Sequence, residues 1–365
     1  SYDADNLDFE LNDNESESST IIISNTGEID SELNYTINSS PFEIEGDGPD
    51  EGGYYWTNSN IDDNTSYDWI DISNIGTIYS FPNNDQAGEW LPLEFNFPFY
   101  NDLNNNSYDQ LFINPNGWLG FEADSDAWDN TSIPTNQING AAIFALWDDL
   151  NPVNEECNQY CSGNVYYHSN SERFVIWFDQ VSHWWTNFEN TFYDFQIVLY
   201  PTGKIDLNYR SLIGDYDASV GIQKNSSIGT QVIYGTDNLA NNLKVTFAAS
   251  PQWLSANPNQ GTLNDGESAN ISVTANSSNL SDGAYNAFLR IVSDGGNASL
   301  PITMLVNGSI LGDTNGDSTI NVLDVIIMVN MILGEIDINL NTADMNGDGL
   351  VNVSDVVLLI NTILG

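Results

Sequence analysis

Acidic charge is the feature of this chain that most restricts how it can fold. Its 365 residues carry 52 acidic side chains and only six basic ones, which gives a formal net charge of −46. Such a chain repels itself unless salt or divalent cations screen the charge, which points to bound calcium or a saline setting. The charge also argues against nucleic acids and anionic membrane surfaces as partners, because both require a basic face.

The composition is nevertheless that of a folded protein. Hydrophobic residues make up 41% of the chain and aromatic residues 12%, which is enough to build cores. No apolar run approaches the ~20 residues that a membrane-spanning helix needs, so membrane insertion is not expected. Residues 1–308 are short apolar–polar alternations separated by Asn, Gly, Asp and Pro, without a sustained helical period. The sequence therefore predicts a mainly β protein built from sandwiches or barrels.

An internal repeat follows the β region. Residues 312–334 and 343–365 are two copies of one pattern, a loop rich in Asp, Asn and Gly followed by an apolar run of helical length. Oxygen-bearing side chains occupy loop positions 1, 3, 5, 9 and 12 in both copies, the spacing at which a loop wraps a calcium ion. The alternative, two polar turns without an ion, would make the agreement of both copies a coincidence. These positions hold Asp313, Asn315, Asp317, Asn321 and Asp324 in the first loop and Asp344, Asn346, Asp348, Asn352 and Asp355 in the second.

Residues 309–365 resemble the type I dockerin, a pair of loop–helix units that binds two calcium ions. Two departures from the ordinary EF-hand accompany this resemblance: no helix precedes either loop, and position 12 is Asp rather than Glu. Position 6 is Ser318 in the first loop and Gly349 in the second, and we expect Ser to weaken the first site. The resemblance implies that Asp313, Asn315, Asp317, Thr319 and Asp324 hold one ion, and that Asp344, Asn346, Asp348, Leu350 and Asp355 hold the other.

Dockerins plug into cohesin modules, so the resemblance also implies a docking partner. Cellulosomal dockerins use a pair of hydroxyl side chains at loop positions 10 and 11, where this chain has Val322–Leu323 and Val353–Ser354. Residues 322–333 are apolar around the whole predicted helix, and a sister helix can cover only one side. We expect the other side to meet a cohesin-like module, the chain's own β domains or another copy of the chain; the alternative is an apolar helix pair with nothing docked. The predicted docking residues are Val322, Leu323, Ile326, Ile327, Val353 and Val357.

Residues 46–243 resemble the nidogen-like (NIDO) extracellular domain. The resemblance rests on the order of four segments: an aromatic stretch at 96–120, a Leu-Trp-Asp-Asp element within 143–152, a Val-Tyr-Tyr strand within 163–185, and an Asn-Thr-Phe strand that runs to Gly-Lys-Ile within 190–210. It implies an antiparallel β domain of an adhesive or matrix protein, with no known chemistry.

An enzyme is the least favoured interpretation of this domain. Asp148–Asp149 and Glu155–Glu156 have the character of paired carboxylates in a glycoside hydrolase, but so acidic a chain places acids side by side by chance. His168 and His183 lack the spacing of a nucleophilic triad or a metal site, and we expect His183 at the rim of a strand end. Asp148, Asp149 and Asn151 are a weaker candidate for a further calcium site.

Carbohydrate binding is the alternative function. Trp184 and Trp185 are adjacent, and an aromatic pair can stack on the sugar rings of a polysaccharide, with Trp118 or Trp128 as further contacts. Packing inside the β domain is the competing explanation for these tryptophans.

The two cysteines favour an oxidising location. Cys157 and Cys161 lie in one loop rich in Gly and Asn, and a short disulfide is favoured there over a free pair. This is consistent with a secreted protein found outside the cell or at its surface.

The rest of the β region predicts one sandwich made of two separate stretches. Residues 253–306 resemble the second part of bacterial Ig-like modules of the BACON kind, in which a hairpin like 19–37 normally comes shortly before. Here about 200 residues separate the two parts. The simplest explanation is that 1–45 and 244–308 form a sandwich and that 46–243 is inserted in one of its loops. Two separate, partial β units are the alternative, but a 45-residue half-sandwich cannot cover its own core.

These features together predict a discontinuous Ig-like β-sandwich, a large inserted antiparallel β domain, and a small α-helical dockerin-like module at 309–365. They predict a secreted, non-catalytic protein that binds two calcium ions and docks to another protein, with self-assembly into an extracellular fibre as an extension. The alternative is a carbohydrate-binding component of a cohesin–dockerin complex.

Overall fold

The computed structural model describes residues 1–43, 46–100, 107–152, 163–184, 191–236, 239–307, 311–316, 319–336 and 338–364. Strands dominate it, as the sequence predicted, and the described helices all lie after residue 320. The chain divides into two compact units, residues 1–38 with 252–365, and residues 39–251. No helix among the described residues is long and apolar enough to cross a membrane.

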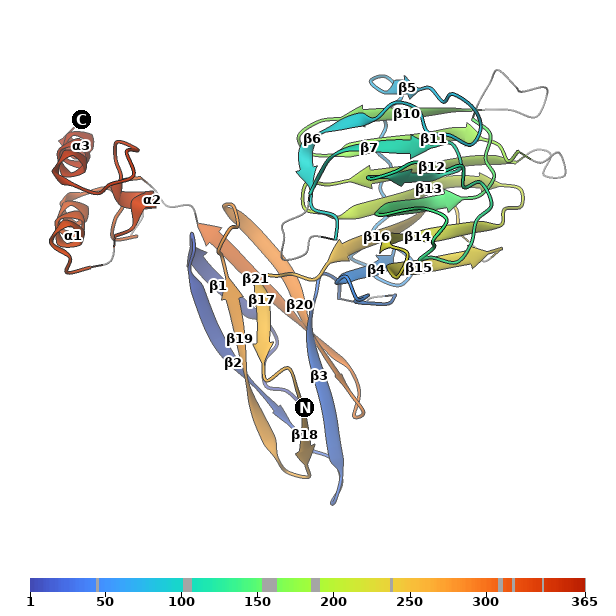
Figure 1. Ribbon diagram of the computed structural model, residues 1–365. Coiled ribbons are helices and arrows are strands. Elements are labelled where there is room, and N and C mark those ends of the chain that lie inside the picture. The colour runs from blue at the N-terminus through green and yellow to red at the C-terminus, as the bar shows by residue number, and fades with distance from the viewer. Residues whose placement is uncertain are drawn as a thin grey trace. The chain divides into compact units, whose positions relative to one another are not determined.

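The first unit contains a β-sandwich whose sheets are assembled from stretches far apart in the sequence (Figure 1). Three early strands pair with three late ones: β1 runs parallel to β21, β2 antiparallel to β19, and β3 antiparallel to β18. The larger sheet has the order β1 (Leu7–Asn12), β21 (Ala298–Asn307), β20 (Gly283–Ser293), β3 (Glu32–Ser40) and β18 (Gln260–Asn264). The smaller has the order β17 (Leu254–Asn257), β19 (Ser268–Asn276) and β2 (Ser16–Ser24).

Alternation along the strands builds the core of this sandwich. On β21, Leu300, Ile302 and Met304 are buried, while the residues between them face solvent, because successive side chains of a strand point to opposite faces. The three early strands contribute about a third of the buried residues of the same core, so neither part of the chain could cover its apolar face alone. Those early contributors include Phe9, Leu11, Ile21, Ile23, Tyr35 and Ile37.

The second unit is a larger two-sheet β domain (Figure 1). Its seven-stranded sheet has the order β4 (Tyr54–Asn58), β16 (Leu243–Ala249), β13 (Ile205–Ile213), β12 (Phe192–Leu199), β11 (Phe174–Val181), β10 (Asn164–Ser169) and β5 (Thr77–Tyr79). Its six-stranded sheet has the order β15 (Ile228–Gly235), β14 (Ala218–Asn225), β9 (Ala142–Trp147), β8 (Trp118–Gly120), β7 (Tyr108–Asn114) and β6 (Leu91–Phe97). All the described pairings within these sheets are antiparallel.

One aromatic-rich core fills the space between these two sheets, and it includes Phe178 and Phe195 from one sheet and Leu111 and Ile143 from the other. The outer faces are covered as well, by loops that carry Ile133 and Ile138 on one side and Trp69 and Ile72 on the other. Central strands are therefore buried on both faces, which explains why β9 is a continuous apolar run rather than an alternation.

Ion pairs in this unit engage at least four of the six basic residues. The Arg210 guanidinium lies 4.3 Å from the centre of the Trp69 ring, and its Nε donates to Asp194 Oδ2 at 2.8 Å. Lys204 and Lys244 both face the buried carboxylate of Asp206, at 3.1 and 3.8 Å, and Arg173 pairs with Glu172. Most of the chain's positive charge therefore balances acids within this unit.

Buried tyrosines make this unit sensitive to high pH. Burial raises the pKa of the Tyr79 hydroxyl from 10.0 to about 12, and the hydroxyl donates to the Glu89 carbonyl at 2.7 Å. The neutral side chain stabilises the fold fully below pH ~10, and this contribution declines up to about 12 because only the unfolded chain ionises there. We expect Tyr79→Phe to make the unfolding free energy fall less steeply over this range, measured by urea unfolding at several pH values.

The exposed Tyr234 on β15 provides the control. Tyr234→Phe should leave the steepness of the decline unchanged, and an equal effect of both substitutions would contradict the assignment to Tyr79.

Two neighbouring residues on β21 test the sandwich core. Met304 is fully buried, whereas Leu305 is 43% exposed. We expect Met304→Ala to lower the unfolding free energy of the sandwich by about 2–5 kcal/mol, because it leaves a cavity among side chains from both parts of the chain. Leu305→Ala should change it by no more than about 0.5 kcal/mol. Differential scanning calorimetry of both variants measures this, and equal destabilisation would be inconsistent with the strand orientation described.

Candidate metal centre and docking face

Each of the two repeat loops leads directly into a helix. The helices are α1 (Val322–Leu333) and α3 (Val353–Leu364), and the short helix α2 (Leu340–Ala343) lies between them in the sequence (Figure 1). No helix was predicted before the second loop, but the structure has the single helical turn α2 there. Asn321 caps α1 by accepting the Leu323 N–H at 2.8 Å, and Asn352 accepts the Ser354 N–H at the same distance.

The aspartates at loop position 12 hold the two ends of each loop together. Asp324 accepts the backbone N–H of Asn315 at 3.1 Å with one oxygen and that of Asn321 at 2.8 Å with the other. Asp355 bonds in the same way to the N–H groups of Asn346 and Asn352, at 3.3 and 2.9 Å. Both carboxylates are fully buried, so the repeat in sequence is also a repeat in geometry.

The aspartates at position 1 fold the turn that follows them. Asp313 accepts the N–H of Gly316 at 2.9 Å, and Asp344 accepts that of Gly347 at the same distance. Asp344 also receives the N–H of Gly349, at 2.8 Å. The Oδ1 atom of Asp344 accepts a second N–H, that of Asp348, at 3.2 Å, so an ion would bind this carboxylate through Oδ2 or replace one of these bonds.

The residues present fit a bound divalent cation, with one rearrangement. No Lys or Arg follows Arg290 in the sequence, so a cation is the obvious counter-charge for the buried Asp324 and Asp355. Asp348 instead accepts from Asn346 Nδ2 at 3.0 Å and from the Leu350 N–H at 2.9 Å. Within the described ranges no three acidic, His or Cys side chains converge as a metal cluster, so Asp348 would have to turn inward for an ion to bind.

Two predicted ligands of the first loop need separate comment. Asp317 lies outside the described residues, as does Ser318, so the expected weakening of that site stays a prediction. The carbonyl of Thr319 accepts Asn321 Nδ2 at 2.9 Å, which is a contact that an ion at the predicted position would compete for.

The helix pair buries only one narrow face. Met328 and Met331 of α1 pack with Leu359 of α3 and Ala343 of α2 to form its small core. The outward faces are apolar, and residues 31 positions apart match in exposure: Val322 and Val353 are 64% and 67% exposed, and Ile326 and Val357 are both 52% exposed. The pairs Val329/Ile360 and Leu333/Leu364 continue these two rows along the helices.

Of the six predicted docking residues, five lie on these rows or beside them, since Leu323 is exposed as well. Ile327 does not: it is half-buried and packs against the core of the helix pair. Val329, Leu333, Ile360 and Leu364 were missed. They could have been identified from the sequence. Val322 and Val353 occupy equivalent positions of the repeat, and counting along each helix at helical spacing from these two residues leads to the four that were missed.

Trp118, one of the further sugar contacts predicted, is enclosed in the core. Trp118 is fully buried between Phe112 and Phe144 and cannot stack on a ligand. Trp184 is half-buried, and Trp128 is 42% exposed. Trp185, Cys157 and Cys161 lie outside the described residues, so the aromatic pair and the disulfide stay predictions.

The carboxylates proposed for hydrolysis have structural partners. His183 is buried rather than at a rim, and its Nε2 lies 3.2 Å from Asp148 Oδ1. The other oxygen of Asp148 accepts the Asp217 N–H at 3.1 Å. Glu155 and Glu156 lie outside the described residues. Asp149 and Asn151 are buried beside Asp148 without forming a metal cluster among the described side chains.

Two models of known protein families match parts of the chain. A family model described as NIDO related matches residues 61–280, more than half of the chain. The match extends beyond the second compact unit into strands β17–β19 of the sandwich. A model of the type I dockerin domain matches residues 311–364. Among curated proteins, none matches the chain. Type I dockerins typically bind calcium and mediate docking between proteins, and both matched module types are non-catalytic.

Two aspartates of the second loop separate structural from ion-binding roles. Asp355→Ala removes a buried carboxylate that satisfies two backbone N–H groups, each worth roughly 1–3 kcal/mol when left unpaired. We expect faster amide exchange across residues 346–364 both in calcium and in chelator, read by hydrogen-exchange mass spectrometry of the full chain. Asp348→Ala, at an exposed position, should raise exchange only in calcium at every amide of this range except that of Leu350, whose N–H the Asp348 carboxylate accepts. Loss of protection at these other amides of Asp348→Ala with chelator present would argue against this division.

Proposed function

Because the chain belongs to the NIDO-related family and carries a type I dockerin module, we propose that it is a non-catalytic extracellular protein that docks to a partner in a calcium-dependent way. The observation that carries this proposal is the pair of matched apolar rows on α1 and α3, each beginning at a loop built around a buried aspartate.

We propose two calcium ions, one in each loop. In each loop the side chains at positions 1, 3 and 5, the carbonyl at position 7 and the carboxylate at position 12 would hold the ion. Bound calcium supplies the positive charge that these carboxylates lack. The ligand sets are Asp313, Asn315, Asp317, Thr319 and Asp324 in the first loop, and Asp344, Asn346, Asp348, Leu350 and Asp355 in the second.

The loops and the docking rows are linked through the helix starts. Asp324 is both a proposed ligand and the third helical residue of the capping box that begins α1. Asp355 makes the same contact at the start of α3. Fixing these carboxylates orders the first turn of each helix, and Val322 and Val353 belong to that turn. Calcium therefore supports docking by ordering the residues that make it.

The partner that this surface favours is apolar where it meets the helices. Dockerin modules bind cohesin modules, and a cohesin-like module is the first candidate. The chain presents Val322–Leu323 and Val353–Ser354 in place of two hydroxyl pairs, so the facing surface should be more apolar than that of a cellulosomal cohesin. A second copy of the chain, or the chain's own β domains, would also cover this apolar surface. Docking between copies would build a fibre.

The β parts serve as spacer and adhesive surface in this proposal. We propose a sandwich of residues 1–45 with 244–308, an inserted domain of 46–243 and a docking module of 309–365, except that β16 (Leu243–Ala249) pairs with β4 and β13 and therefore belongs to the inserted domain. Pairing of early with late strands supports the insertion.

Calcium dependence of docking tests the proposal. The full chain is examined by light scattering and negative-stain microscopy in calcium and in excess EDTA, and by surface plasmon resonance over immobilised type I cohesin modules. We expect either cohesin binding or ordered self-assembly in calcium, and loss of both in EDTA. The double variant Val322→Asp/Val353→Asp should abolish the interaction, because it places charge in both apolar rows.

A matched control is Ile75→Asp, which alters an exposed apolar residue of the other unit, 57% exposed. Calorimetric calcium titration of the double variant confirms that its loops still fold. Neither assembly nor cohesin binding in calcium, or an interaction that survives the double substitution, would contradict the proposal.

A further inference from the structure

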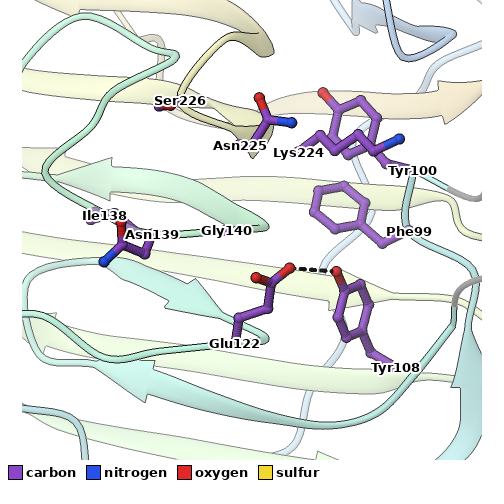
Figure 2. Close-up of a pocket in the computed structure, with 10 residues that line it drawn as sticks. All are labelled: Phe99, Tyr100, Tyr108, Glu122, Ile138, Asn139, Gly140, Lys224, Asn225 and Ser226. Atoms are coloured by element: carbon purple, nitrogen blue, oxygen red, sulfur yellow. Dashed lines mark hydrogen bonds between the residues drawn. The ribbon is translucent and has the colours of Figure 1, made fainter.

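A polar pocket of about 440 Å³ opens at one end of the six-stranded sheet, where the ends of β7, β8, β9 and β14 come together. This volume lies within the ~300–1,000 Å³ typical of small-molecule sites. Glu122 and Tyr108 lie along one side of the pocket, Lys224 and Asn225 lie along the opposite side, and Phe99 lies between them in this view (Figure 2). None of these residues belongs to the helical module or to the predicted tryptophan platform.

The acidic side of the pocket is fixed in place. The Tyr108 hydroxyl donates to Glu122 Oε1 at 3.0 Å, and the other carboxylate oxygen packs on Gly140. A Cβ added to Gly140 would lie 2.3 Å from Glu122 Oε2, and its φ of +82° already favours glycine. Glu122 is an exposed residue but is thereby held as an oriented acceptor at the pocket wall.

The opposite side is fixed by a turn. Asn225 Oδ1 accepts the N–H groups of Ser227 and Ile228 at 2.9 and 3.0 Å, so its carbonyl side is engaged and its amide NH₂ is the group left to serve a ligand as donor. Lys224 adds an ammonium beside it. Glu122 and Lys224 carry opposite charges, and the pocket is close to neutral in a chain of net charge −46.

Backbone strain marks the same place. Tyr100, whose ring lines the pocket, has a φ of +48°, which is uncommon for a bulky side chain. Its hydroxyl donates to Asp50 Oδ2 at 2.6 Å, and burial beside that carboxylate raises its pKa. Strain of this kind persists where the surrounding structure imposes it, and it is concentrated at ligand sites.

We propose that this pocket binds one neutral sugar ring of a glycan. Each sugar hydroxyl both donates and accepts, which suits a wall with a fixed carboxylate acceptor facing ammonium and amide donors. The ring of Tyr108 packs against Phe121, with 4.7 Å between the ring centres, and is half-buried, so its exposed part would be the apolar surface for the C–H face of the sugar. An anionic ligand would face Glu122 and the acidic chain, and a cationic one would face Lys224. Neutral glycans are thereby the proposed ligands of the adhesive surface described under the proposed function, and this binding would not depend on the calcium loops.

Sugar binding to the full chain tests this proposal. Methyl glycosides of glucose, galactose, mannose, xylose and N-acetylglucosamine, and their short β-linked oligomers, are screened by saturation-transfer NMR, and the affinity of each binder is measured by calorimetry. We expect at least one neutral sugar to bind. Glu122→Gln and Lys224→Gln should each weaken it about tenfold or more, as expected when a hydrogen bond to a charged group is lost.

Two comparisons keep the outcome clear. Trp184→Ala should leave the affinity unchanged, and a loss there would place sugar at the predicted tryptophan platform instead. Thermal unfolding of each variant verifies folding, and binding in EDTA separates this site from calcium-dependent docking. Preference for glucuronate or glucosamine over the neutral sugars, unchanged affinity in both Glu122→Gln and Lys224→Gln, or no binding across the set would each overturn the proposal.

Discussion

Repulsion between acidic side chains is the constraint on which the rest of this structure depends. Five of the six basic residues lie between positions 173 and 244, inside the larger β unit, where at least four of them pair with acids. The helical module has none. Its buried Asp324 and Asp355 are balanced among the described residues by backbone N–H groups and by the positive ends of their helices, which leaves a divalent cation as the natural further partner.

The same two aspartates link the proposed ion-binding loops to the apolar docking rows on the helices. The carboxylate at loop position 12 also accepts the N–H of the residue that caps the following helix, so an ion bound to it would also hold the first helical turn in place. The exposed apolar rows start in that turn. Exposed rows of Val, Ile and Leu are unfavourable in water unless a partner covers them, and the proposed calcium dependence would confine formation of this docking surface to calcium-rich conditions.

The two β units depend on the burial of apolar faces. A sandwich of two sheets needs both apolar faces, and here the faces come from stretches separated by a whole second domain. The second domain can be inserted in the sequence between these two stretches because its own core is complete and both outer faces of its sheets are covered. Strand ends then remain for loops and for the pocket around Glu122 and Lys224, which is where β folds usually carry their ligands.

The sequence by itself determined the features that depend on local order. Alternation predicted the mainly β fold, and ligand spacing with helical periodicity predicted both loops and the exposure of Val322, Ile326, Val353 and Val357. Only the tertiary structure decided what depends on distant segments: Ile327 turns to the core, Trp118 is enclosed, His183 meets Asp148, and four strand ends meet around one pocket. Burial is a property of contacts between remote parts of a chain, and spacing along the sequence does not encode it.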